Sequence, residues 1–380
     1  MKYHPFFIAL FIINTIFGIL FAFFNNNLDD NSNTSEENND NKTNNLFDKS
    51  ITSEKNNDTK KDDLNEISKA SDILNNIDTS IESDIISDSL YIQNQTYSYI
   101  PCAYATDNGY IYPTLVSITS LVQNAKDKTF YEIYIMISYD FTEENKKILK
   151  SVENKYKKNC KIIFIDMGTK FQGEKITDRV KTPTYYRLEL PDLLPNINQI
   201  IYMDGDTLIF EDLTELIEID MKDDYVYGFL DERINALKKF GIENGIYLCA
   251  GVLLMNLNAL RKNNISEKFI EFLNKERDRI DQNDQTIINV VCQEKIGILP
   301  PKYGIWNFPD KPYAQRHNKL QRKNVQYNSD EFVKAYLHPA IVHYVFKPFG
   351  KKKKYLYNEW WDYAKRTGYY NEIFDLYLNN

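Results

Sequence analysis

Two aspartates separated by one glycine are the residues of this sequence best suited to chemistry. Asp204 and Asp206 follow an apolar run that begins at Ile200 and is typical of a buried strand. If the backbone stays extended, both carboxylates point to one side, where at roughly 6–7 Å they repel by about 2.5 kcal/mol. A divalent cation such as Mg²⁺ or Mn²⁺ converts this repulsion into attraction, and Gly205 would let a bulky anion approach the backbone. The pattern predicts a metal and diphosphate site, with an acidic turn after a strand as the alternative.

Two further segments carry residues that could bind parts of a nucleotide. The predicted strand at residues 100–105 runs into Asp107 and Tyr110, where the carboxylate could accept a hydrogen bond from a base and the ring could stack on it. An ordinary Asp-Asn-Gly turn is the alternative. Arg187 precedes the central strand and could neutralise a phosphate by a bidentate contact, whereas a surface arginine on a helix is the plain alternative.

The second half of the chain adds two more candidate positions. Asp284 and Gln285 precede the apolar helix predicted at residues 286–291, so Asp284 either belongs to a site or caps that helix. His343 ends a short apolar run and could be a third metal ligand, or a core histidine. Lys347 follows closely and could neutralise a phosphate.

Strands and helices that alternate along the chain must position these residues. The sequence predicts strands at residues 100–105, 132–138, 161–166, 200–203 and 251–257, and helices at residues 112–122, 141–156, 185–190, 213–217 and 266–273. Such alternation predicts an α/β fold with a mostly parallel central sheet covered by helices on both faces. Ligands of such sheets bind outside the carboxyl ends of the strands, where the candidate aspartates lie. Residues 355–378 form an aromatic helical stretch that we expect to pack on the body of the protein.

The N-terminal quarter has a different character. Residues 5–24 are almost wholly apolar and long enough to span a bilayer, so we predict a signal anchor at residues 1–24, with a cleaved signal peptide as the alternative. The charges flanking this span place its N-terminus in the cytoplasm and the body of the protein on the lumenal or external side, Golgi-like if the source is eukaryotic. The cytoplasmic face of a bacterial inner membrane is the alternative location. Residues 25–98 are polar and Asn-rich, which predicts a disordered stem.

Bulk composition limits the classes of function. The 380 residues carry a net charge of −8, which argues against a nucleic-acid partner. The four cysteines lack the spacing of a zinc site and lie beside apolar runs, so buried free thiols are expected, with one disulfide left open.

Taken together, these segments resemble the family 8 glycosyltransferases, which include glycogenin and bacterial lipopolysaccharide α-galactosyl- and α-glucosyltransferases. The resemblance covers about residues 100–361. It rests on Tyr104-Ala105-Thr106-Asp107 with Tyr110, Thr184-Tyr185-Tyr186-Arg187, Tyr202-Met203-Asp204-Gly205-Asp206-Thr207, Ala250-Gly251-Val252-Leu253-Leu254-Met255-Asn256-Leu257, Asp284-Gln285, Leu299-Pro300-Pro301-Lys302-Tyr303 and His343 followed by Lys347-Pro348.

The resemblance implies a GT-A fold, a UDP-sugar donor, Mn²⁺ (or Mg²⁺) as cofactor and retention of the anomeric configuration. It implies that the sugar is a hexose, glucose or galactose first, and that the acceptor is a glycan, glycolipid or glycoprotein. By matching position, the donor would be held by Ala105, Thr106, Asp107, Tyr110, Arg187, Asp204, Gly205 and Lys347. The metal would be bound by Asp204, Asp206 and His343. Catalysis would fall to Asp284, on the donor sugar, and Gln285, beneath the anomeric carbon.

Two departures from the family pattern keep a second hypothesis open. Cys249 stands where the family usually has an asparagine that contacts the sugar region, and only three residues separate His343 from Lys347. A catalytically weak protein of the same fold that binds sugar nucleotides, or a scaffold, is therefore the alternative to an enzyme. Another Mg²⁺-dependent phosphate enzyme, such as a nucleotidyltransferase, is disfavoured because the chain has no Gly-rich phosphate loop.

The sequence thus predicts four parts. They are an anchor at 1–24, a stem at 25–98, a GT-A domain at 99–350 and an aromatic helical extension at 351–380. The expected partners are the membrane, a UDP-sugar and the acceptor, and homo-oligomer formation is left open.

Overall fold

A computed structural model describes residues 97–174, 182–231, 233, 235–307, 327–345 and 355–379. The predicted anchor, nearly all of the predicted stem and Lys347 lie outside these residues, so the structure does not test them. Among the helices that the structure describes, none combines the length and the apolar character needed to cross a bilayer.

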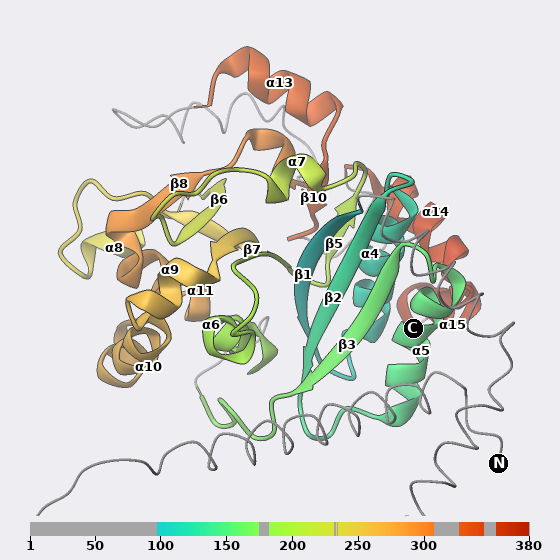
Figure 1. Cartoon of the computed structure of the whole chain (residues 1–380), viewed down its shortest axis with the longest axis horizontal. Helices are drawn as coiled ribbons and strands as arrows, with labels where there is room; N and C mark the ends of the chain where they lie inside the picture. Colours follow the sequence, from blue (N-terminus) through green and yellow to red (C-terminus); the bar gives the residue numbers. More distant parts are fainter. Residues whose placement is uncertain are drawn as a thin grey trace, which may run out of the picture. The chain divides into compact units, whose positions relative to one another are not determined.

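A seven-stranded sheet forms the centre of the fold (Figure 1). In spatial order its strands are β3 (Cys160–Asp166), β2 (Thr129–Ile137), β1 (Ser98–Thr106), β4 (Gln199–Met203), β7 (Leu248–Asn256), β6 (Val226–Leu230) and β8 (Ile296–Ile298). The pairs from β3 through β4 are parallel, whereas β7 runs antiparallel to both of its neighbours. The predicted mostly parallel α/β sheet is confirmed, with β7 as one reversed strand.

Both faces of this sheet are buried, which explains why its central strands read as continuous apolar runs. Along β1 and β4, successive side chains enter opposite cores: Ala103 and Tyr202 face one cluster of buried residues, while Cys102 and Ile201 face the other. Alternation along an extended strand therefore supplies two cores from one run of apolar residues. All four cysteines are buried free thiols, as predicted.

Helices cover the two faces. The α-helices of the described residues are α4 (Ile111–Gln123), α5 (Glu143–Lys155), α6 (Leu190–Leu193), α7 (Thr214–Ile217), α8 (Asn235–Lys238), α9 (Leu257–Lys262), α10 (Ile265–Glu276), α11 (Asn283–Val291), α13 (Ser329–Leu337), α14 (Tyr357–Arg366) and α15 (Tyr370–Phe374). Short 3₁₀ segments are η2 (Thr182–Glu189), η3 (Arg277–Arg279), η4 (Gln293–Lys295) and η5 (Pro301–Tyr303), and η6 (Asp375–Asn379) is a single π turn. Figure 1 shows α4, α5 and α14 beside β1–β3, with α9, α10 and α11 grouped on the other side.

The stretch from Ile200 to Ile209 forms two strands, one before and one after the acidic turn. It is divided between β4 in the large sheet and β5 (Thr207–Ile209) in a three-stranded sheet with β10 (Ile341–His343) and β9 (Ile305–Trp306). Residues 204–206 make the turn between the two sheets, and the Asp206 carbonyl accepts a hydrogen bond from Tyr344 N–H at 2.9 Å. This second sheet carries His343 toward the acidic turn, a long-range pairing that local sequence patterns do not reveal.

The helix predicted at residues 141–156 illustrates how local chemistry sets an element. Thr142 caps α5 by accepting a hydrogen bond from the Asn145 N–H at 3.2 Å, two glutamates occupy the first turn and Lys155 the last. The helix predicted at 185–190 is instead the 3₁₀ segment η2 followed by α6, because Pro191 has no N–H to continue regular α-helical hydrogen bonding.

The C-terminal helices pack on the body of the protein, as predicted. Trp360 of α14 is fully buried in one of the two cores, with its ring centroid 5.1 Å from that of Trp361. Tyr363 accepts a hydrogen bond from Asn124, at the end of α4, at 2.7 Å. The last helices are therefore part of the folded core.

Replacing Trp360 with alanine should lower the free energy of unfolding by about 3–5 kcal/mol, because it leaves a large cavity in a closed core. Leu376→Ala, in the same C-terminal stretch but with a side chain that is 44% exposed, is the control and should change it by less than about 0.5 kcal/mol. Urea unfolding of the two variants gives the comparison. Equal stabilities would show that α14 is a detachable extension.

Candidate active site

The carboxyl edge of the large sheet gathers the candidate residues. Asp107 follows β1, Asp204 follows β4 and Asp231 follows β6, and these three strands run in the same direction. Strand β7 runs the opposite way, so residues 249–251 at its beginning lie at this same edge. Parallel strands thus bring to one place residues that are far apart in the chain.

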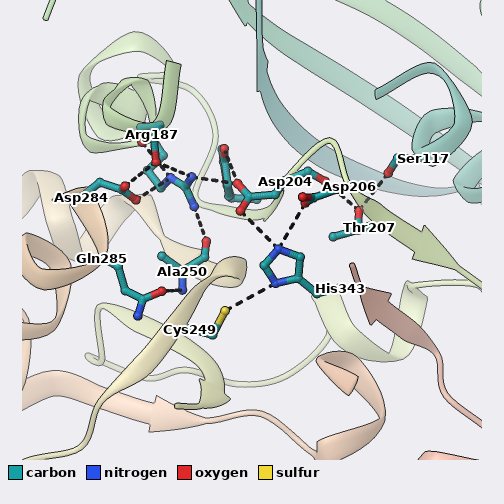
Figure 2. A network of polar contacts seen from close by, with 12 residues as sticks. Ser117, Arg187, Asp204, Asp206, Thr207, Cys249, Ala250, Asp284, Gln285 and His343 are labelled. Carbon is teal, nitrogen blue, oxygen red and sulfur yellow. Dashed lines mark hydrogen bonds and ion pairs between the residues drawn. The ribbon is translucent and has the colours of Figure 1, made fainter. Parts of the chain in front are cut away.

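Asp204, Asp206 and His343 form a cluster whose ligand atoms all lie within 4.8 Å of one another. His343 Nε2 is 3.6 Å from Asp204 Oδ2 and 3.2 Å from Asp206 Oδ1 (Figure 2). Another oxygen of each carboxylate is held by a donor: Tyr110 donates to Asp206 Oδ2 at 2.7 Å, and Arg187 donates to Asp204 Oδ1 at 2.8 Å. Two oriented carboxylate oxygens and one imidazole nitrogen therefore converge, a donor set that fits Mn²⁺ or Mg²⁺.

The charges of this cluster shift its titration. Burial works against ionisation of Asp206, yet the neighbouring His343 holds the pKa of that carboxyl below its usual value. Burial also opposes protonation of His343, but Cys249 and Asp206 raise its pKa well above the usual range. The imidazole and the Asp206 carboxylate thus favour each other's charged forms.

Arg187 is buried and joins several elements, with a side chain only 2% exposed. Its NH2 group contacts Asp204, its Nε lies 3.0 Å from Asp284 Oδ2, and its NH1 donates to the Ala250 carbonyl. The guanidinium carbon lies 4.0 Å from the ring centroid of Tyr202. The alternative of a surface arginine is wrong, and the predicted contact with the donor phosphate stays a prediction.

Asp284 lies inside α11, near its start, with its carboxylate aimed at Arg187. Thr184 Oγ1 also donates to it. Burial raises the pKa of Asp284 to about 6, although Arg187 and Thr184 pull it down. The N-cap residue of this helix is Gln282, so the alternative of a capping aspartate is not the arrangement found.

Gln285 is held from both ends of its amide. Its Oε1 accepts the Ala250 N–H at 3.1 Å, and its Nε2 donates to Asp231 Oδ2 at 3.0 Å. Asp231 in turn receives a bidentate contact from Arg233. The side-chain amide that the resemblance places under the reacting carbon is therefore fixed in orientation.

The nucleotide end of the site is less fully defined. Asp107 and Tyr110 do form a turn, in which the Tyr110 N–H bonds to the Asp107 carbonyl at 3.1 Å, but the Tyr110 hydroxyl reaches Asp206. Ala105 and Thr106 end β1 beside them. A Cβ on Gly205 would lie 2.3 Å from Thr114 Oγ1, so this glycine is needed for close packing against α4. The roles of these residues on the donor stay predictions.

Sequence reasoning assigned no role in this network to three of its residues. Asp231 follows a buried strand, the same signal that singled out Asp204, but the strand pattern after Phe229 is weak. Thr184 and Tyr202, whose hydroxyl lies 3.1 Å from Asp204 Oδ1, are polar groups whose partners depend on tertiary contacts alone.

Solved structures with the same architecture show which fold this is. The galactosyltransferase LgtC, solved in complex with donor and acceptor sugar analogues, matches with a TM-score of 0.59 and 22% identity over 70% of this chain and 96% of that chain. An apo structure of the bifunctional glycosyltransferase WbbM also gives 0.59, with 19% identity over 73% of this chain and 51% of that one. The fold is therefore an α/β fold of the GT-A kind.

Residues 101–353 match the model of glycosyl transferase family 8, and the chain belongs to that family. A Haemophilus influenzae protein that is named as a glycosyltransferase is 33% identical over 57% of this chain and 66% of its own length. General stress protein A of Bacillus subtilis is 27% identical over 65% of this chain and 87% of its own. Lipopolysaccharide 1,2-glucosyltransferase of Escherichia coli is 25% identical over 72% and 77%, respectively. The resemblance inferred from the motifs is confirmed.

The raised pKa of Asp284 has a measurable effect on stability. The folded protein favours the neutral acid of Asp284. The free energy of unfolding of the parent should therefore fall by up to about 3 kcal/mol as the pH rises from 3.8 through about 6 and this group ionises. The free energy of unfolding of Asp284→Asn, relative to the parent, should therefore increase between pH 4 and pH 7. Urea unfolding in EDTA measures this difference, and Asp192→Asn, on the surface of α6, should show none of it. A difference that does not change with pH would contradict the burial of an ionising carboxyl.

Proposed function

We propose that this protein is a metal-dependent, retaining glycosyltransferase that transfers a hexose from a UDP-sugar to a glycan acceptor. The observation that carries the proposal is the convergence of Asp204, Asp206 and His343, beside Asp284 and Gln285, at the sheet edge of a family 8 chain. Relatives named as lipopolysaccharide glucosyl- and galactosyltransferases support a hexose and a glycan or glycolipid acceptor.

A bound divalent cation would neutralise the charge that develops on the diphosphate as the sugar–phosphate bond breaks. The protein's own contribution is orientation. Tyr110 and Arg187 each hold one oxygen of a metal-binding aspartate, so the remaining oxygens are already directed before any ligand binds. Such preorganisation avoids rearrangement during the reaction.

The carboxylates near the reacting carbon are engaged in ways that support front-face attack by the acceptor. Asp231 has no exposed side-chain surface and is held by Arg233 and Gln285, while Asp284 is paired with Arg187. A carboxylate held by a cation is a poor nucleophile because its electron pairs are already engaged. A double displacement through a covalent glycosyl intermediate is therefore disfavoured.

A panel of UDP-sugars, assayed for hydrolysis with and without Mn²⁺, tests the proposal directly. The proposal expects Mn²⁺-dependent release of UDP from UDP-glucose or UDP-galactose. Binding of the panel without turnover would support the alternative of a weak sugar-nucleotide-binding or scaffold protein. Absence of both would overturn the assignment.

Replacing one metal-binding carboxylate should abolish Mn²⁺-dependent binding of UDP. Asp206→Asn removes a negative charge and a ligand, so affinity should fall by more than about 100-fold, beyond the usual cost of changing an outer-shell partner. Calorimetry with UDP and Mn²⁺ measures it, and Asp192→Asn, the same substitution on the surface of α6, is the control. Unchanged affinity in Asp206→Asn would exclude this metal site.

Substitution of Gln285 should affect turnover more than donor binding. The amide lies where an interaction would strengthen in the transition state, so Gln285→Ala should lower kcat and kcat/KM together by roughly 10²–10³. Asn289→Ala removes a buried amide one turn further along α11, whose hydrogen bonds within the described residues go to backbone groups of Leu248 and Gln285. It controls for loss of packing, and its folded fraction should retain kcat. Parental turnover in Gln285→Ala, or an inverted product anomer, would contradict the mechanism.

A further inference from the structure

Cys249 makes a contact that neither the family pattern nor the proposed chemistry accounts for. Its Sγ lies 3.5 Å from Nδ1 of His343, on the side of the ring opposite the two aspartates (Figure 2). Both residues are buried, with 4% and 7% of their surface exposed. The sulfur and the acidic pair thus contact the two nitrogens of one imidazole.

The backbone of β7 also restricts this ring. A Cβ placed on Gly251 would lie 2.1 Å from the Cε1 of His343, so the imidazole edge rests directly against the strand. Cys249 and Gly251 are two residues apart on β7 and contact the same ring. The strand therefore limits both the position of the imidazole and its rotation.

The chemistry of histidine then assigns a task to the sulfur. An imidazole that offers the lone pair of Nε2 to a cation must carry its proton on Nδ1, and this N–H needs an acceptor. The partner of the second nitrogen sets which tautomer is present and how the ring is oriented. In this protein the atom facing Nδ1 is the Cys249 sulfur.

Two of the other buried thiols provide a comparison with Cys249. Cys102 and Cys292 are fully buried within the two apolar cores. Cysteine in such positions behaves as a small apolar side chain. Cys249 lies in a core as well, but its sulfur points at a titratable ring.

We propose that Cys249 is a positioning residue for the metal site, whose sulfur accepts the Nδ1–H of His343 and thereby directs Nε2 toward Asp204 and Asp206. The inference rests on the metal site of the proposed function. It assigns to the departure from the family's asparagine a role on the metal ligand instead of the sugar. A sulfur acceptor is weaker than a carboxylate, so geometry contributes more than added basicity.

Binding of Mn²⁺ alone to the full-length protein, followed by electron paramagnetic resonance of the free ion, provides the first test. Cys249→Ala should weaken binding by about 10–100-fold, the range seen when an outer-shell partner of a metal ligand is lost. Cys249→Ser retains an acceptor and should recover most of the affinity. Cys102→Ala removes an equally buried thiol of β1 and should leave it unchanged.

The second readout is the tautomer of His343, which would not change if Cys249 had a purely structural role. In the Mg²⁺-loaded parent, ¹⁵N NMR should show His343 with a protonated Nδ1 and an unprotonated Nε2, and Cys249→Ala should broaden or mix these signals. Equal Mn²⁺ affinity in Cys249→Ala and the parent, with an unchanged tautomer, would overturn the inference while leaving the metal site intact. A parent that binds no Mn²⁺ would overturn both.

Discussion

The candidate site depends on one buried cation. Arg187 lies between Asp204 and Asp284 and also binds the Ala250 carbonyl, so a single guanidinium links η2, β4, β7 and α11. Removing one partner from such a buried group leaves an uncompensated charge, which usually costs several kcal/mol. The fork of the guanidinium, with donors in fixed directions, is what allows one side chain to serve both carboxylates. The distance between the predicted metal ligand Asp204 and the predicted sugar ligand Asp284 is therefore set by the dimensions of an arginine.

This arrangement divides the acidic residues into two groups with different tasks. Asp284, next to Arg187, has a raised pKa because burial outweighs the neighbouring cation, whereas His343 lowers the pKa of Asp206 despite its burial. A carboxyl whose ionised form is stabilised by its surroundings is suited to binding a cation. A carboxyl that is costly to ionise is suited to hydrogen bonding with hydroxyls. Burial, Arg187 and His343 thus favour different roles for Asp206 and Asp284, although both residues are aspartates.

The sequence allowed prediction of what depends on local pattern. The apolar runs of β1, β2 and β4, the capped helix α5 and the Asp-x-Asp turn all carry short-range signals, and the rule that ligands bind at the carboxyl ends of strands located the site. The sequence did not reveal the reversed direction of β7 or the burial of Arg187, because both depend on contacts between distant segments. Asp231 was missed because β6 was not predicted: it has five residues, as β4 does, but Gly228 at its centre weakens the strand signal.

Two glycines make the site rigid through contact, without special backbone angles. Gly205 allows the acidic turn to lie against Thr114 of α4, and Gly251 allows the His343 ring to lie against β7. A side chain at position 205 would clash with Thr114, and one at position 251 would displace the His343 ring. His343 ends β10, and the turn that carries Asp204 and Asp206 is held between β4 and β5, so regular strands fix the segments that carry the predicted ligands more closely than a long loop would. Because turnover falls steeply when reacting groups are misplaced by even about 1 Å, this close packing is as much a part of the proposed chemistry as the carboxylates themselves.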